Sequence, residues 1–360
     1  MNRKLKICVI GGGIFGLTTA IYLSKYSKII KIFDRNSYIL NGATRYNHNR
    51  HHYGFHYPRS LETAYQCLDA KKDFHKYYQN CIDYYFQNIY AISKDNSKIS
   101  YHKFENFCKK AFLKLSNIDI PTTIFHPEKI SKCYVVNEGV YNFFKIKSAI
   151  IKRVVNSKNI KIIKNININS FVDQNKFIEY LSGNKLIKED FDLIINATYD
   201  GINSHILKTK NKINMEYNLQ EMCKLKINSK RFGSTILDGE FPSILPIAGK
   251  RNEYLFAHVK YSQLFKKISK NIPIEILNKK IPSQIKKTIK KSEEYLKVLN
   301  DSKIIGSFRV IRAVKVDKEN DSRKSEIICH SNGNFSIFSG KIITVEKIAK
   351  DLSKLVNHKY

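Results

Sequence analysis

The chain has 360 residues, which is enough for one elaborate unit or two interleaved domains. Hydrophobic residues make up 42% of it and aromatic residues 12%, which argues against a wholly disordered protein. The net charge of +32 is typical of proteins that bind nucleic acid, an anionic membrane surface or an anionic substrate. Because Lys, Ile and Asn are so abundant, an AT-rich genome is the favoured explanation of this excess, and no nucleic-acid motif accompanies it.

The seven cysteines are odd in number and scattered, and none forms a CxxC pair. This pattern predicts neither a disulfide framework nor a zinc site, and it favours a reducing cytoplasm. No apolar run is long enough to span a membrane. The first predicted strand begins near Leu5, so cleavage of a signal peptide would destroy the glycine motif that follows. We therefore expect a cytoplasmic protein.

The first elements form a strand–turn–helix–strand unit. Residues 5–10 (LKICVI) are a short apolar run, as expected for a parallel strand buried on both faces. A glycine turn over residues 11–16 leads into a helix that ends near residue 25, and a second strand over residues 29–33 ends at Asp34. The unit therefore predicts a nucleotide-binding α/β domain.

The later elements alternate between helices and strands, and there is no internal repeat. Residues 42–60 read as a functional loop, rich in polar and aromatic side chains. The expected elements are a helix over 61–92, mixed strand and helix over 93–136, a helix over 143–155, a strand or hairpin over 160–171, a buried strand over 191–197, a sheet region over 214–262, Lys-rich amphipathic helices over 263–299, a strand over 335–338 and a terminal helix to about 355.

The glycine turn carries the clearest chemistry. Gly11 allows a tight turn, Gly13 lets the backbone approach a pyrophosphate, and Gly16 lets the helix pack on the strand. The helix N-terminus then presents free N–H groups and a positive dipole to the phosphates. A GxGxxG motif alone is weak evidence, but here it lies between a strand and a helix.

Asp34 completes the unit, 18 residues after Gly16, where an acid would accept hydrogen bonds from the ribose hydroxyls of adenosine. The motif does not distinguish FAD from NAD. The residues of this unit predicted to bind the dinucleotide are Gly11, Gly13, Ile14, Phe15, Gly16, Asp34 and Arg35.

The loop over residues 42–60 shifts the prediction to FAD. It starts with Gly-Ala-Thr and carries His52, Gly54 and Tyr57 in an H-x-G-x-x-Y pattern. This segment resembles the D-amino-acid-oxidase-like superfamily of FAD-dependent oxidoreductases. The nearest branches are glycerol-3-phosphate dehydrogenase and L-2-hydroxyglutarate oxidase, together with oxidoreductases of bacterial surface-polysaccharide gene clusters.

The resemblance implies roles for the loop residues. Ala43 and Thr44 would lie near the FAD ribityl chain and pyrophosphate, and His52 and His56 near the isoalloxazine and the substrate. An Arg takes the place of His56 in the glycerol-phosphate branch, so the resemblance does not imply phosphate recognition. Relatives that bind FAD covalently use a position near Asn47, so no covalent bond is predicted.

Two further segments resemble family motifs. Residues 160–171 resemble a strand pair over the adenine, with Ile168 at a backbone contact. Residues 192–198 (DLIINAT) resemble a D-x-V-[IV]-N-A-T-G motif and bring Ala197 and Thr198 to the cofactor. Tyr199 replaces the glycine of that motif, so we expect the backbone there to differ.

A third segment, residues 339–344 (SGKIIT), resembles the G-G-K-x-T-T turn that opens the last helix in the glycerol-phosphate branch. The resemblance implies that this helix start aims N–H groups at the N1/C2=O edge of the flavin and stabilises negative charge there. The predicted cofactor-binding residues of the turn are Gly340, Lys341, Ile342 and Ile343.

The substrate side is marked by His258 and Arg312. His258 lies in a strand pair expected over the flavin and is either a base or an ordinary hydrogen-bonded sheet histidine. Arg312 sits where the family places a substrate-binding Arg and could grip a carboxylate or phosphate through two hydrogen bonds, whereas Arg309 fits a surface salt bridge. The four loop histidines share no metal-like spacing with a carboxylate or Cys, so no metal is predicted.

We therefore predict an α/β protein with a discontinuous FAD-binding Rossmann-like domain (1–70, 138–205 and 304–360) and an antiparallel-sheet α+β substrate domain (71–137 and 206–303). It would oxidise a C–OH or C–NH group of a small substrate, including anionic, sugar-linked or nucleotide-sugar molecules, by hydride transfer to flavin N5. The catalytic residues would be His52, His56, His258 and Arg312. The alternatives are an NAD(P)-dependent dehydrogenase, a basic nucleic-acid-binding or flavin-dependent nucleic-acid-modifying protein, and a degenerate flavoprotein.

Overall fold

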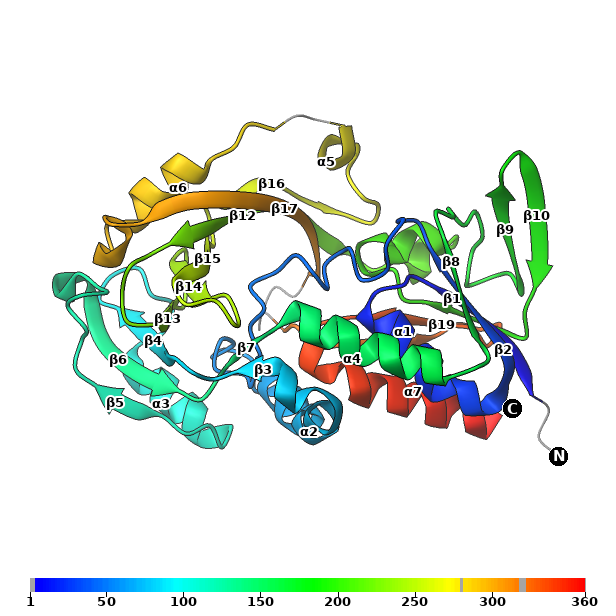
Figure 1. The fold of residues 1–360 in the computed structure, drawn as a ribbon, viewed down its shortest axis with the longest axis horizontal. Helices are drawn as coiled ribbons and strands as arrows, with labels where there is room; N and C mark the ends of the chain where they lie inside the picture. Colours follow the sequence, from blue (N-terminus) through cyan, green and yellow to red (C-terminus); the bar gives the residue numbers. More distant parts are fainter. Residues whose placement is uncertain (1–3, 279–280, 317–321, 360) are drawn as a thin grey trace.

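The computed structural model describes residues 4–278, 281–316 and 322–359. Two large sheets organise it (Figure 1). The first has six strands in the order β18–β19–β11–β1–β2–β8, parallel except for β18. Its strands are β1 (Leu5–Ile10), β2 (Ser27–Asp34), β8 (Ile160–Lys164), β11 (Leu193–Asn196), β18 (Glu326–Cys329) and β19 (Phe335–Phe338).

Both faces of this sheet are buried, as the apolar run of β1 predicts. Ile7 and Val9 join the core on one face, and Cys8 and Ile10 join a separate core on the other. Helices α1, α4 and α7 pack on the first face, and a hairpin of β9 and β10 covers the second (Figure 1). These elements are α1 (Ile14–Leu23), α4 (Phe143–Asn156), α7 (Val345–Lys359), β9 (Phe177–Ser182) and β10 (Lys185–Asp190).

The second sheet has nine strands and is mostly antiparallel. Its long strand β12 pairs with β17 on one side and with β16 and then β15 on the other. The strands are β4 (Gln87–Ser93), β5 (Ser116–Ile118), β6 (Ile130–Val136), β12 (Met215–Lys226), β13 (Phe232–Leu237), β14 (Pro242–Pro246), β15 (Glu253–His258), β16 (Gln263–Ser269) and β17 (Lys303–Lys315).

The connections between the sheets hold the remaining elements. The segment after β2, which includes the histidine-rich loop, crosses from the first sheet towards the second (Figure 1). Helix α2 then packs against α7. The other elements are α2 (Leu61–Tyr78), α3 (Tyr101–Lys110), α5 (Ile274–Asn278), α6 (Ile285–Ser292), the short pair β3 (Ile82–Asp83) and β7 (Val140–Tyr141), and single 3-10 turns.

Three expected elements are wrong in type or extent. The helix predicted over 61–92 ends at Tyr78, because β4 becomes a buried strand between β13 and β6. Part of the Lys-rich region predicted as helix is strand β16, which pairs with the first half of β12. Of the strand or hairpin predicted over 160–171, the strand forms as β8 but ends at Lys164, and the hairpin lies at β9 and β10.

The predicted fold class is confirmed: a mostly parallel sheet, discontinuous in sequence, faces a mostly antiparallel sheet. Two predicted boundaries do not coincide with the change of sheet. The predicted FAD-binding segment that starts at residue 304 begins with β17, but β17 belongs to the second sheet. The predicted boundary at residue 70 falls within α2, and α2 packs against α7 on both sides of it. Among the described residues, none of the helices combines the length and the apolar character that a membrane span requires.

Candidate active site

A cavity of about 730 Å³ is lined by residues from both sheets and from the loop that joins them. The first sheet contributes the carboxyl ends of β1, β2 and β11, where ligands bind in open α/β sheets. The second contributes side chains of β12, β14, β15 and β17. A ligand in this cavity would therefore touch both halves of the molecule.

The glycine turn forms one end of the cavity. Gly11 has a φ of +107°, and a Cβ there would lie 2.6 Å from the carbonyl oxygen of Ala197. Gly16 could not carry a Cβ either, because the Gly11 carbonyl oxygen occupies that space; it packs the helix and does not line the cavity. At Gly13 the nearest atom to a Cβ is Thr44 Oγ1 at 3.6 Å, so this backbone is open to a ligand.

Asp34 lines the cavity beside this turn. Its Oδ2 accepts a hydrogen bond from the Gly12 amide at 2.6 Å, and its Oδ1 accepts one from the Asn36 amide at 2.7 Å. Oδ1 also accepts from Asn36 Nδ2 at 3.0 Å. A carboxylate has about four acceptor sites, so Asp34 can hold the turn and still accept from a ribose hydroxyl. Arg35 also lines the cavity and pairs with Asp200 at 3.1 Å.

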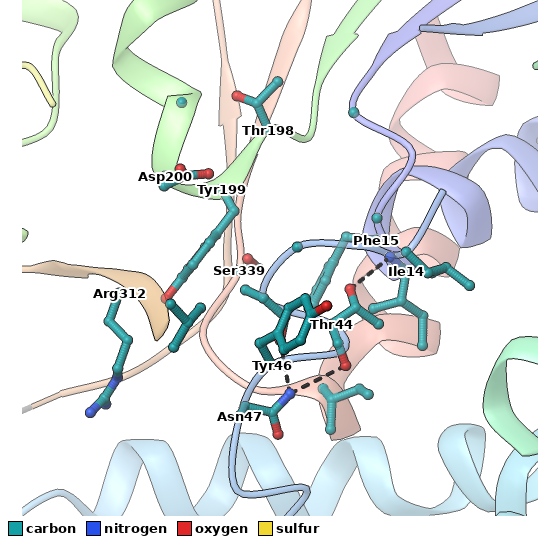
Figure 2. Close-up of a pocket in the computed structure, with 18 of the residues that line it drawn as sticks. Ile14, Phe15, Thr44, Tyr46, Asn47, Thr198, Tyr199, Asp200, Arg312 and Ser339 are labelled. Atoms are coloured by element: carbon teal, nitrogen blue, oxygen red, sulfur yellow. Dashed lines mark hydrogen bonds between the residues drawn. The ribbon is translucent and has the colours of Figure 1, made fainter. Parts of the chain in front are cut away.

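The joining loop is fixed by its own side chains. Thr44 Oγ1 accepts from the Ile14 amide at 3.3 Å, which caps helix α1, whose first turn has no cap of its own (Figure 2). Asn47 donates to the Ala43 carbonyl at 2.8 Å and accepts from the Tyr141 hydroxyl at 2.6 Å. Ala43 and Thr44 line the cavity, as do Ile168, Ala197 and Thr198. Asn47 is therefore an anchor of the loop.

Three histidines of the loop line the cavity with unpaired ring nitrogens. His48 Nε2, His52 Nδ1 and His56 Nδ1 are buried and have no hydrogen-bond partner. Burial lowers the pKa of all three, to about 3 for His48, and the nearby cations lower it further. They are therefore neutral at physiological pH, and their unpaired nitrogens indicate a ligand site.

His51 does not line the cavity and lies 2.9 Å from His75, Nε2 to Nε2. Across the described ranges, His, Cys, Asp and Glu side chains form no group of three that could hold a metal ion. The density of histidines in this loop therefore reflects one buried pair and three cavity-lining rings.

Arg50 is a cavity-lining residue that the sequence analysis missed. Its buried guanidinium donates to Thr235 Oγ1 at 2.6 Å and Ser243 Oγ at 2.8 Å, and it lies 3.8 Å from Glu138 Oε2. Burial raises the pKa of Glu138, while Arg50 opposes this shift. The only sequence signal is an Arg inside the His-rich loop; its buried partner Glu138 lies 88 residues further along the chain.

Arg312 lies on β17 and lines the opposite wall of the cavity, across from Thr44 (Figure 2). Its Nη1 donates to Gln220 Oε1 at 3.0 Å, a neutral partner. Arg309, three residues earlier on the same strand, pairs instead with Glu221 at 3.1 Å and does not line the cavity. The structure thus separates the two arginines as the sequence predicts.

His258 lines the cavity but is a poor candidate for the base. Its Nδ1 accepts hydrogen bonds from the amides of Lys260 at 3.1 Å and Tyr261 at 3.4 Å. The ring proton therefore sits on Nε2, which can only donate. Burial lowers the pKa of His258 to about 4. The alternative of a hydrogen-bonded sheet histidine fits these contacts, and the role of His258 as a base stays a prediction.

Tyr199 holds an unusual backbone conformation. Its φ of +58° lies in the left-handed region that glycine favours and that a residue with a Cβ rarely adopts. Its ring lines the cavity and extends towards β17 (Figure 2), where its hydroxyl oxygen accepts from the Ala313 amide at 3.3 Å. This side chain links the two sheets at the cavity wall.

The turn before the last helix also differs from expectation. The Gly340 amide donates to Ser325 Oγ at 2.7 Å, and the space of a Gly340 Cβ is taken by the Arg323 carbonyl oxygen. The Gly340 amide therefore does not point at a flavin edge. Ile343 is fully buried in the core and does not line the cavity, whereas Ile342 does.

Lys341 also lines the cavity, and its Nζ lies 4.2 Å from the centre of the Tyr57 ring. Its charge contributes to the lowered pKa values of His52 and His56. Positive charge at this wall therefore comes from a side chain as well as from the helix start.

The residues present fit an FAD molecule. The open backbone at Gly13 suits a pyrophosphate, Asp34 suits a ribose, and the unpaired histidine nitrogens at the other end suit a polar ring or substrate. The cavity is continuous between these two ends. An elongated dinucleotide matches this arrangement.

Comparisons with known proteins agree with this interpretation. The family model described as DAO, FAD dependent oxidoreductase, matches residues 6–112. The FAD-dependent monooxygenase kojA of Aspergillus flavus is 23% identical over 283 residues, covering 72% of this chain. The match spans 63% of that relative's length.

Solved structures share the fold over nearly the whole chain. NikD, an unusual amino acid oxidase essential for nikkomycin biosynthesis, aligns with a TM-score of 0.76 at 9% identity and covers 99% of this chain and 95% of its own. L-alpha-glycerophosphate oxidase from Mycoplasma pneumoniae, solved with FAD bound, aligns with a TM-score of 0.73 at 13% identity over 99% and 95% of the two chains. Residues 6–112 therefore resemble the DAO family of FAD-dependent oxidoreductases, as the motifs predicted, and the chain as a whole shares the fold of the solved oxidases.

Proposed function

We propose that the protein is an FAD-dependent oxidoreductase that oxidises a C–OH or C–NH group of a small anionic molecule. The observation that carries this proposal is the single cavity that joins a dinucleotide cradle at Gly13 to Arg312 and three neutral histidines. A large pocket with a few converging polar groups and perturbed pKa values is the usual form of an active site.

In this proposal the first sheet and the loop hold the cofactor. Gly13, Ile14 and Phe15 would face the pyrophosphate, Asp34 the adenosine ribose and Ile168 the adenine. The loop residues Ala43 and Thr44, the β11 end at Ala197 and Thr198, Arg35, and the turn at Gly340, Lys341 and Ile342 complete the lining. When bound, the flavin supplies an acceptor for a hydride.

The protein's own side chains would then bind and orient the substrate. Arg312 offers N–H donors to a carboxylate or another anion, because Gln220 takes only one of them. A neutral histidine, His48, His52 or His56, would accept the proton released from the substrate O–H or N–H group. The strands of the second sheet that line the cavity would limit the access of water to the substrate.

The fungal relatives are named monooxygenases, so oxygen insertion is the second candidate function. The two functions differ in what reduces the flavin. An oxidase or dehydrogenase is reduced by its own substrate without oxygen, whereas a monooxygenase that is reduced by an external donor keeps an oxidised flavin when only its substrate is added. Anaerobic mixing with substrate alone distinguishes them.

The net charge of +32 is the one observation that favours the nucleic-acid alternative, whereas the lining of the cavity suits a small molecule. All seven cysteines are free thiols, which is compatible with the proposed reducing cytoplasm.

The cofactor proposal is tested at Gly13. A Gly13→Val change adds side-chain atoms to the open face of the turn, where the nearest protein atom to the new Cβ is Thr44 Oγ1 at 3.6 Å. The protein should still fold, while its affinity for FAD falls by about 10- to 100-fold, roughly the loss of one or two phosphate hydrogen bonds. FAD binding is measured by fluorescence titration of the FAD-free chain, and wild-type protein should show flavin absorption at about 450 nm.

The matched control is Gly183→Asn at the exposed tip of the β9–β10 hairpin. Gly183 has a φ of +60°, which Asn tolerates, and no atom lies within 4 Å of its Cβ position. This variant should bind FAD like wild type. A Gly13→Val protein with unchanged FAD affinity, or a wild-type protein that binds no FAD, would overturn the proposal.

A further inference from the structure

The part of the cavity around Arg312 and the three histidines, called here the substrate-side wall, carries no carboxylate among the described residues. In the described part of the chain, Asp34 and Asp200 are the only acids that line the cavity. Asp34 is bound by the amides of Gly12 and Asn36 beside the dinucleotide turn, and Asp200 pairs with Arg35. Both acids are therefore engaged at the adenosine end.

Three cations line the substrate-side wall: Arg50, Arg312 and Lys341. The charge of Arg50 is largely balanced by Glu138, which does not line the cavity and whose Oε2 lies 3.8 Å from Arg50 Nη1. Arg312 bonds to a neutral amide, Gln220. The wall is therefore net positive. Burial is the main cause of the lowered pKa values of His48 and His56, and the charges of Arg50 and Arg312 lower them further.

A positive wall discriminates between the two substrate types that the proposed function allows. It attracts the anionic group of either type, but it repels an ammonium group. An aliphatic amine with a pKa near 10.4 is neutral in only about one molecule in 1,000 at about pH 7.4, so an amine that must bind neutral loses about that factor in affinity. An alcohol is already neutral and loses nothing.

The histidines add a second preference. His48, His52 and His56 are neutral, and each has one buried ring nitrogen without a partner. Depending on its tautomer, each nitrogen donates or accepts a hydrogen bond, and a hydroxyl group can satisfy either case. An ammonium group only donates. Several hydroxyls on one substrate therefore match this wall better than ammonium groups do.

We propose that the substrate is a hydroxylated carboxylic acid whose oxidised group is an alcohol, bound by Arg312 through its carboxylate. This inference rests on the proposed function. In the reaction, the C–H bond of the alcohol would break and its hydrogen would leave with both electrons, for which FAD, when bound, would supply the acceptor. The O–H proton would pass to a neutral histidine, and the C–O bond would become the C=O of a ketone or aldehyde acid.

The first test measures binding of an inert matched pair. 2-Hydroxyisobutyrate and 2-aminoisobutyrate share a carboxylate and two methyl groups, and neither has a C–H on the substituted carbon, so neither can be oxidised there. Binding to the FAD-loaded full chain is followed by the change in flavin absorbance from about pH 6.5 to about pH 8.5. The hydroxy acid should bind at least about 30-fold more tightly near neutral pH, with little pH dependence, while the amino acid should gain about tenfold per pH unit.

Equal affinities with equal pH profiles would overturn the inference. Arg312→Lys should weaken binding of the hydroxy acid by about tenfold, because a lysine cannot reproduce the paired donors of a guanidinium. Arg309→Lys is the matched control on the same strand, since Arg309 pairs with Glu221 outside the cavity and should leave binding unchanged. Equal losses in the two variants would contradict the role of Arg312.

The second test measures anaerobic reduction of the flavin with oxidisable pairs: glycerate against serine, and gluconate against 2-amino-2-deoxygluconate. We expect the hydroxy acid of each pair to bleach the flavin faster. Faster bleaching by the amino acids would overturn the inference and leave the proposed function standing. If no member of either pair binds or bleaches a flavin that dithionite reduces normally, then the proposed function itself fails for small carboxylates.

Discussion

Tyr199 offers a direct test of how this chain departs from the glycine of its family motif. It holds a φ of +58°, a conformation that costs a residue with a Cβ about 1–2 kcal/mol. Its ring packs with the core that contains Ala313, and its hydroxyl accepts from the Ala313 amide at 3.3 Å. These contacts offset the strain.

Two substitutions isolate the strain. Tyr199→Gly and Tyr199→Ala lose the same ring and the same hydrogen bond, so these losses cancel in the comparison. In ordinary backbone, Ala is more stabilising than Gly by about 0.4–1 kcal/mol. The left-handed penalty exceeds this difference, so at residue 199 the Gly variant should be the more stable by about 0.5–1 kcal/mol.

The assay is urea unfolding of the FAD-free protein followed by circular dichroism. Ala149→Gly in helix α4 is the control and should show the ordinary order, losing about 1 kcal/mol. Tyr199→Phe keeps the ring and the strain and should lose about 1 kcal/mol, from the unpaired Ala313 amide. A Tyr199→Ala protein as stable as Tyr199→Gly, or more so, would refute the reasoning.

Three further predictions concern stability and reactivity. In the folded protein the pKa values of His48 and His258 are lowered to about 3 and about 4, so as the pH falls the unfolded chain takes up these two protons first. The free energy of unfolding should therefore be highest above about pH 6.5 and fall by about 1.4 kcal/mol per pH unit for each group as the pH drops towards 4. The slope should be shallower in His48→Gln, and a free energy of unfolding that does not change over this pH range would contradict the prediction. Glu346→Gln should lower the free energy of unfolding by about 3 kcal/mol, because it removes the fully buried carboxylate that pairs with Arg153. The control is Lys347→Gln at the next residue, where the exposed pair with Asp69 is lost; it should lower the free energy of unfolding by less than about 1 kcal/mol in the same assay. A thiol reagent should modify Cys329 alone in native protein and seven cysteines in denaturant; rapid native labelling of several thiols would mean that the core opens.

The sequence alone determined the parts of this protein that depend on local pattern. The apolar run at β1, the glycines at 11 and 13 and the acid at 34 depend on short-range sterics, so the strand–turn–helix unit and the resemblance of residues 6–112 to the DAO family could be predicted from consecutive residues. The same holds for the different surroundings of Arg309 and Arg312, because side chains three residues apart on a strand face opposite sides.

Only the tertiary structure decided the features that depend on distant partners. Strand β16 has a helix-like, Lys-rich sequence, but pairing with β12 supplies its backbone hydrogen bonds. Ser325 Oγ accepts the hydrogen bond of the Gly340 amide, and His258 Nδ1 accepts one from the turn after β15. Glu138 lies beside the Arg50 guanidinium although the two residues are 88 positions apart in the sequence. No local pattern encodes such pairings, because each depends on which groups folding buries together.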